Sequence, residues 1–71
     1  MQHRAPLKRY TVRELAWRSG SRRRLIDRSA FFSRAQRIAE HASRGDRQIV
    51  VEAGGQILSV WVSGTLVSET D

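Results

Sequence analysis

Apolar residues recur with helical spacing in the middle of the chain, between Ser33 and Gly45. The residues of this stripe fall at i, i+3, i+4 and i+7: Ala35, Ile38, Ala39 and Ala42. Ser33 and Gln36 have the spacing of a capping box, and Gly45 is a residue on which helices commonly end. The pattern therefore predicts a helix over Ser33–Arg44 with one apolar face.

A second stripe on the same predicted helix is basic. Its members are Arg34, Arg37, His41 and Arg44. At about 100° per residue these side chains lie together beside the apolar stripe. This face is either a ridge that binds a partner or a charged surface that simply faces water, and charge runs on helices are often the latter.

The C-terminal half alternates in the manner of strands. Segments 48–53 and 56–62 flank Gly54-Gly55, a pair that suits a two-residue hairpin turn with positive φ at both positions. The simplest register pairs Val51 with Leu58 and Ile49 with Val60. One face is then apolar and the other mixed. The predicted apolar face holds Ile49, Val51, Leu58, Val60 and Val62, and the other holds Glu52, Ser59 and Ser63.

A further turn is predicted at Ser63-Gly64, which leads into a short edge strand over 65–67. This turn places Leu66 opposite Trp61, and we expect Trp61 to cover the outer face of the sheet. Residues 68–71 are polar and acidic and form a predicted tail, whereas residues 1–8 form a basic arm with the chain's one proline.

Residues 10–32 admit two interpretations. Thr11 and Glu14 have capping-box spacing, and a turn at Ser19-Gly20 would give a helix-turn-helix. Alternatively, residues 18–20 close a β-hairpin around a glycine. The register of that hairpin sets Val12 opposite Ile26, Glu14 opposite Arg24 and Tyr10 opposite Arg28. One register thus yields an apolar pair and a charge pair, which favours the hairpin.

Together these elements predict a small α+β domain over residues 9–67. The expected architecture is ββαβββ, an antiparallel sheet of four to five strands with one helix packed across one face. The expected core lies between helix and sheet, and comprises Val12, Ile26, Phe32, Ala35, Ile38, Ala39, Ala42, Ile49, Val51, Leu58 and Val60.

Charge points to an anionic partner. The 71 residues carry 13 Lys plus Arg against 7 Asp plus Glu, a net charge of +6, and all of the basic residues but Lys8 are arginine. Arginine suits bidentate contact with phosphate or carboxylate, so a nucleic acid, a ribonucleoprotein or an acidic protein face is the expected partner. The absence of cysteine fits a reducing, cytoplasmic setting, and no apolar run reaches the length of a membrane span.

Catalytic and metal-binding patterns are not found in the sequence. His3 and His41 lack ligand spacing, and the carboxylates are scattered. Gly54-Gly55 precedes a strand where a phosphate cradle would need a helix. We therefore expect neither an enzyme nor a cofactor, metal or small-molecule substrate.

A second basic cluster lies at the tip of the predicted first hairpin, where general solubility is an alternative to binding. It comprises Arg18, Arg22, Arg23 and Arg24. Trp17 and Trp61 could stack on bases, but the sequence does not place either beside the arginines.

The segments Tyr10-Thr-Val-Arg-Glu-Leu and Ser33-Arg-Ala-Gln-Arg-Ile-Ala resemble a known family. They are similar to a small phage-encoded anti-CRISPR protein that acts on the type I-F surveillance complex. Its members show Tyr-x-[Ile/Val]-[Lys/Arg]-Glu in an opening strand, Ser-x-Ala-x-Arg-Ile-Ala at a helix start, and later strands around a glycine turn. The resemblance spans roughly Arg9 to Val67 and favours the hairpin over the helix-turn-helix.

The resemblance implies a non-catalytic inhibitor in the cytoplasm of the host bacterium. Such a protein docks on the backbone subunits that hold the guide RNA and blocks target DNA, and it can promote non-specific duplex DNA binding by the inhibited complex. The family's binding surface maps onto Tyr10, Gln36, Arg37 and His41, with Gln36 and His41 standing where the family has lysines. Arg34 and Arg44, on the same stripe, could restore that charge.

Two functions of different classes therefore stand beside each other. The first is an anti-CRISPR interaction protein that binds a type I CRISPR ribonucleoprotein. The second is a small basic DNA- or RNA-binding module, such as a phage or plasmid regulator, with a helix-turn-helix as one form it could take.

Overall fold

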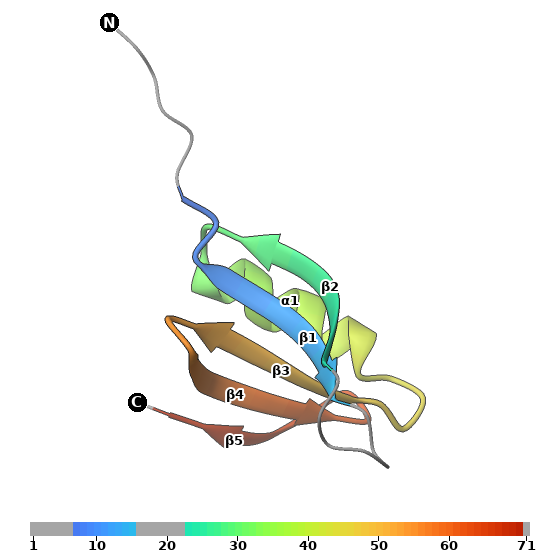
Figure 1. Cartoon of the computed structure of the whole chain (residues 1–71). Coiled ribbons are helices and arrows are strands. Elements are labelled where there is room, and N and C mark those ends of the chain that lie inside the picture. Colours follow the sequence, from blue (N-terminus) through green and yellow to red (C-terminus); the bar gives the residue numbers. More distant parts are fainter. Residues whose placement is uncertain (1–6, 16–22, 71) are drawn as a thin grey trace, which may run out of the picture.

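The computed structural model describes residues 7–15 and 23–70. For Arg23 it describes the backbone only. The elements are β1 (Tyr10–Leu15), β2 (Arg23–Ser29), α1 (Phe32–Ala42), β3 (Gln48–Ala53), β4 (Gln56–Val62) and β5 (Thr65–Glu69) (Figure 1). This order is the predicted ββαβββ. Because β1 and β2 are strands, the helix-turn-helix interpretation of residues 10–32 is wrong, and the predicted tip at 18–20 lies outside the described residues.

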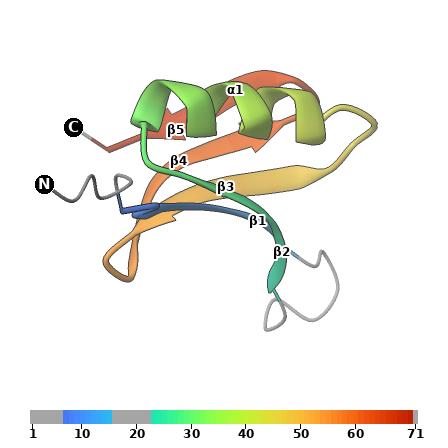
Figure 2. The same cartoon turned by 90° about the horizontal axis from the view of Figure 1, so that it is seen from above.

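The five strands form one antiparallel sheet in the order β2-β1-β3-β4-β5. Helix α1 lies across one face of this sheet, and the two layers are seen edge-on in Figure 2. It packs against β1, β2, β3 and β4. The edge strands are therefore β2 at one side and β5 at the other.

The first hairpin contains a β-bulge that the sequence did not predict. Glu14 pairs with Arg24 as expected, but Val12 pairs with Asp27 and Tyr10 with Ser29, one residue away from the predicted partners. Ile26 is the extra residue on β2. A bulge turns the side chain of the extra residue, and here Ile26 still packs against the core.

The second hairpin contains a bulge of the same kind at Leu58. Glu52 pairs with Ile57 in the predicted register, but beyond the bulge Val51 pairs with Ser59 and Ile49 with Trp61. Because a shift of one residue exchanges the faces of a strand, Ser59 and Trp61 lie on the helix side. The predicted apolar face and the outward position of Trp61 are therefore wrong, although Trp61 does pair with Leu66 of β5.

The core lies between α1 and the four strands that it covers, β1 to β4. Its fully buried members are Val12, Ala35, Ala39, Ile49 and Val51. The half-buried residues around them are Tyr10, Ile26, Phe32, Ile38, Ala42 and Trp61. Leu58 and Val60 were predicted core residues but are not in this cluster, because the bulge exchanges them for Ser59 and Trp61.

The helix begins one residue earlier than predicted and without the capping box. Phe31 occupies the N-cap position in an extended conformation, with no side-chain cap hydrogen bond. Instead, Ser29 orders the approach: its hydroxyl donates to the Phe31 carbonyl oxygen and accepts from the Phe31 N–H, both at 3.1 Å. The helix ends at Ala42 with Ser43 as its C-cap, two residues short of the predicted Arg44, and Gly45 has φ of 81° in the following loop.

Both predicted C-terminal turns are confirmed. Gly54 and Gly55 have φ of 57° and 77°, and Ser63 and Gly64 have φ of 52° and 77°. Strand β5 extends two residues beyond the predicted Val67, and the Thr70 N–H then donates to the Leu58 carbonyl oxygen at 2.7 Å.

The turn between β3 and β4 gives a direct test of this backbone geometry. We expect Gly55→Ala to lower the free energy of unfolding by about 1–2 kcal/mol, since a Cβ is disfavoured at positive φ. Space is not the cause, because no atom lies within 4 Å of the added Cβ. Asparagine tolerates positive φ better than alanine does, so Gly55→Asn should lower the free energy of unfolding by less. Urea unfolding measures both, and equal losses would contradict the backbone explanation.

Candidate functional site

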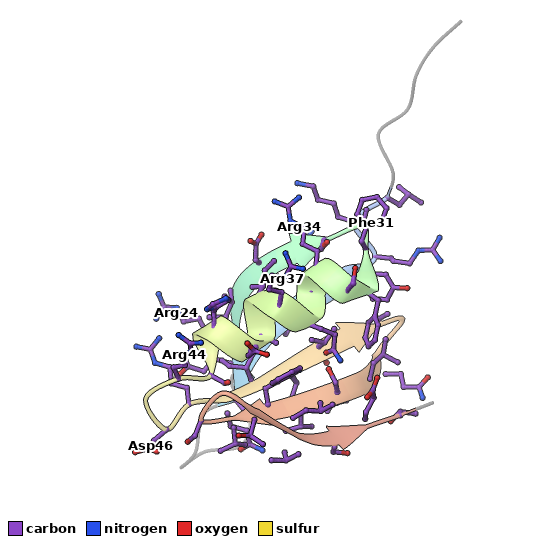
Figure 3. The ribbon with its side chains drawn as sticks, turned by 180° about the vertical axis from the view of Figure 1, so that it is seen from behind. Arg24, Phe31, Arg34, Arg37, Arg44 and Asp46 are labelled. Atoms are coloured by element: carbon purple, nitrogen blue, oxygen red, sulfur yellow. The ribbon has the colours of Figure 1, made fainter. Side chains whose placement is uncertain are left out.

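An open groove runs along α1. Figure 3 shows two of its residues, Arg34 and Arg37, on the side of the helix toward β2. The volume of the groove is about 740 Å³, and it is lined by Ser33, Arg34, Arg37, Ile38, His41 and Ala42. The lining residues recur at helical spacing, so the helix alone determines which side chains share the groove. We call this surface the basic groove, because Arg34, Arg37 and His41 supply its basic side chains, beside the apolar Ile38 and Ala42.

The charges of the basic groove are not neutralised within the described part of the chain. No acidic residue is among its lining residues. Two salt bridges among the described residues join Arg13 Nε to Glu52 Oε1 at 3.2 Å and Arg47 Nε to Glu14 Oε2 at 3.9 Å, and neither involves the groove. Arg34, Arg37 and His41 are all exposed, so an anionic partner can reach them.

Arg44 and Arg24 lie at one end of the helix, outside the lining of the basic groove (Figure 3). Arg44 follows the helix, and the aliphatic part of its side chain passes close to Gly64. A Cβ added at Gly64 would lie 3.7 Å from Arg44 Cγ. Arg24 is exposed on β2 opposite Glu14. The predicted basic stripe is thus divided: three of its residues line the groove, and Arg44 turns toward the β4–β5 turn.

Gln36 lies on the other side of the helix, where it holds α1 to β4. Its Oε1 accepts hydrogen bonds from the Ser59 hydroxyl and from Trp61 Nε1, the latter at 2.9 Å. Ser59 is 1% exposed, so this amide oxygen satisfies a polar group that water does not reach. The structure therefore does not place Gln36 with Arg37 and His41 on one surface.

Tyr10 also lies apart from the basic groove. It is half-buried at the start of β1, and its ring packs against Phe32 with the centroids 5.5 Å apart. Of the second basic cluster, Arg18 and Arg22 and the side chain of Arg23 lie outside the described residues, as does Trp17.

One exposed aromatic residue was not identified from the sequence. Phe31 is 59% exposed at the junction of β2 and α1, close to Arg34 (Figure 3). The adjacent Phe32 packs into the core. The available signal was periodicity: since only one of two adjacent residues at a helix start can face the core, the other must face water.

Neither a metal site nor a membrane span is found in the part of the chain that the structure describes. No group of three His, Asp or Glu side chains there could hold a metal ion. No helix among the same residues is long and apolar enough to cross a bilayer. Comparisons with models of protein families, with curated proteins and with solved structures return no match.

Proposed function

We propose that this protein is a non-catalytic binding protein whose basic groove docks on an anionic face of a larger assembly. Following the resemblance at residues 10–15 and 33–39, the assembly is a type I CRISPR surveillance complex, and docking on its guide-holding backbone subunits blocks target DNA. The observation that carries the proposal is the alignment of Arg34, Arg37 and His41 along one open groove that no described acidic residue lines.

The shape of the groove supports a macromolecular partner. It is open along one side of an 11-residue helix, so it can receive an extended surface. The two guanidinium groups of the groove can each bind a carboxylate or phosphate in bidentate fashion, and the apolar Ile38 and Ala42 in the same lining can contact aliphatic side chains of the partner. Such contacts across an interface set specificity and association rate.

The ββαβββ fold also bears on the second function. This fold excludes a helix-turn-helix regulator, because the described residues contain no second helix that could enter a major groove. What remains of that alternative is general attraction between a basic surface and duplex phosphates.

Co-purification with a type I-F surveillance complex tests the proposal. We expect the tagged protein to retain the complex, and the loaded complex to lose binding of its target duplex. The free protein should not shift a random duplex at about 0.15 M salt, where exposed charges are screened beyond about 8 Å. Failure to retain type I complexes, with a clear shift of random duplex, would instead support the nucleic-acid-binding module.

A further inference from the structure

A second, smaller hollow lies where β2 turns into α1, next to the basic groove. Its volume is about 270 Å³. It is lined by Lys8, Asp27, Arg28, Ser29, Ala30, Phe31 and Arg34. We call it the junction hollow. It is formed by three segments, the approach to β1, the end of β2 and the first turn of α1.

An exposed aromatic ring, that of Phe31, lines the junction hollow. Phe31 is 59% exposed, the largest exposed fraction of any aromatic side chain in the described residues. Its backbone is fixed from both sides: the buried Ser29 hydroxyl bonds its N–H and its carbonyl oxygen, and that oxygen also accepts from the Ala35 N–H at 3.1 Å. The backbone that carries the ring is thus fixed before any partner binds, and the ring offers an exposed, flat apolar surface.

Three cations surround this ring. Lys8, Arg28 and Arg34 are exposed and line the same hollow. Asp27 is the one carboxylate in the lining, and its Oδ1 accepts the Arg28 backbone N–H at 2.7 Å. The hollow therefore has a net positive charge, and no salt bridge within the described part of the chain occupies its cations.

We propose that the junction hollow binds single-stranded nucleic acid. An unpaired base stacks on Phe31, and the phosphates on either side of that base contact Lys8, Arg28 and Arg34. Exposed aromatic rings between basic side chains are how proteins without sequence preference hold single strands. A duplex cannot use the ring in this way, since its bases are stacked on one another.

This proposal does not rest on the proposed function. The two surfaces share Arg34, but Phe31 lines only the junction hollow and Arg37 and His41 line only the basic groove. A variant of Phe31 therefore tests the hollow while leaving the groove intact.

The test is fluorescence anisotropy of the full chain with labelled oligothymidylate and oligouridylate of about 10 nucleotides, within the usual range of single-strand sites. We expect Phe31→Ala to weaken binding about 5- to 150-fold, the loss that corresponds to stacking of one base. Phe31→Tyr retains a ring and should bind as the wild type does. Three phosphate contacts also predict about a 20-fold loss of affinity between about 0.05 and 0.2 M salt.

Leu25 provides the matched control. Leu25 lies on β2 and, like Phe31, is an exposed apolar residue, with 44% of its surface exposed. It is not in the lining of the hollow. Leu25→Ala should leave binding unchanged, and far-UV circular dichroism checks that each variant is folded. The two oligonucleotides distinguish RNA from DNA as the ligand, because only the former offers 2′-hydroxyl groups.

The same anisotropy measurements can contradict the proposal. If neither oligonucleotide binds at about 0.05 M salt, where phosphate contacts are strongest, the hollow is not a nucleic-acid site. If the Phe31→Ala and Leu25→Ala variants bind the oligonucleotides with equal affinity, base stacking is not involved. The same conclusion follows if Phe31→Ala lowers the affinity for a duplex by the same factor as the affinity for a single strand. Co-purification with a surveillance complex can succeed or fail independently of either result.

Discussion

Replacing Gln36 with alanine is expected to lower the free energy of unfolding by about 1–3 kcal/mol, because it leaves a buried donor, the Ser59 hydroxyl, and a half-buried donor, Trp61 Nε1, without their acceptor. The Ser59 hydroxyl and Trp61 Nε1 both donate to Gln36 Oε1. The Ser59 side chain is almost fully buried, so water cannot replace the lost oxygen there. The loss is a large fraction of the stability of a domain of this size.

Urea unfolding followed by circular dichroism measures this effect. Arg37→Ala is the matched control: it alters the next residue of the same helix, whose side chain is exposed, and should change stability by less than about 0.5 kcal/mol. Gln36→Glu retains acceptor oxygens, so it should lower the free energy of unfolding by less than Gln36→Ala does. If Gln36→Ala unfolds at the wild-type urea concentration, the contact between α1 and β4 does not depend on this side chain.

The same variant separates two roles for Gln36. The resemblance assigns this position to a binding surface, whereas the structure places its amide oxygen between α1 and β4. A purely structural role predicts a less stable protein that still docks at temperatures where it is folded. A loss of docking with unchanged stability would return Gln36 to the binding surface.

The strands were predictable from the sequence, but their faces were only partly so. Near each turn the predicted pairs are correct, as for Glu14 with Arg24 and Glu52 with Ile57. Beyond Ile26 and Leu58 the register shifts by one. A β-bulge has no reliable signature in a short apolar strand, because an apolar residue on either face satisfies the same pattern.

The helix shows why capping patterns mislead when a better partner exists. Ser33 and Gln36 have capping-box spacing, but a serine on β4 and the indole of Trp61 compete for the same amide. Those partners come from 23 and 25 residues further along the chain. Local spacing cannot register such contacts, which depend on how the helix crosses the sheet.

The candidate site divides in a similar way. Arg34, Arg37 and His41 share a groove because helical periodicity alone brings them together, so the sequence could predict them. The junction hollow combines Lys8, Arg28 and Phe31 from three segments, and its residues meet only after the sheet has formed. Sequence periodicity within one element cannot indicate a site of that kind.

The double variant Arg34→Glu with Arg37→Glu is expected to weaken docking on a type I-F surveillance complex about 30-fold or more. Removing one member of a charge pair at an interface costs about 2–5 kcal/mol, and reversal adds repulsion. Both residues are exposed on α1, so the fold should be retained. Surface plasmon resonance with immobilised complex gives the affinity, and target-duplex binding reports the inhibition. Arg37→Glu alone should produce a smaller loss in the same direction.

Arg47→Glu is the control for net charge. Arg47 is exposed in the loop between α1 and β3, outside the basic groove, and its pairing with Glu14 at 3.9 Å contributes less than about 1 kcal/mol. Equal losses for Arg37→Glu and Arg47→Glu would mean that total charge, and not the groove, attracts the partner. Because long-range attraction is screened by salt, those equal losses would also vanish as salt is raised, whereas contacts inside the groove would still slow dissociation. The dissociation rate at high salt therefore decides whether the basic groove is the docking surface.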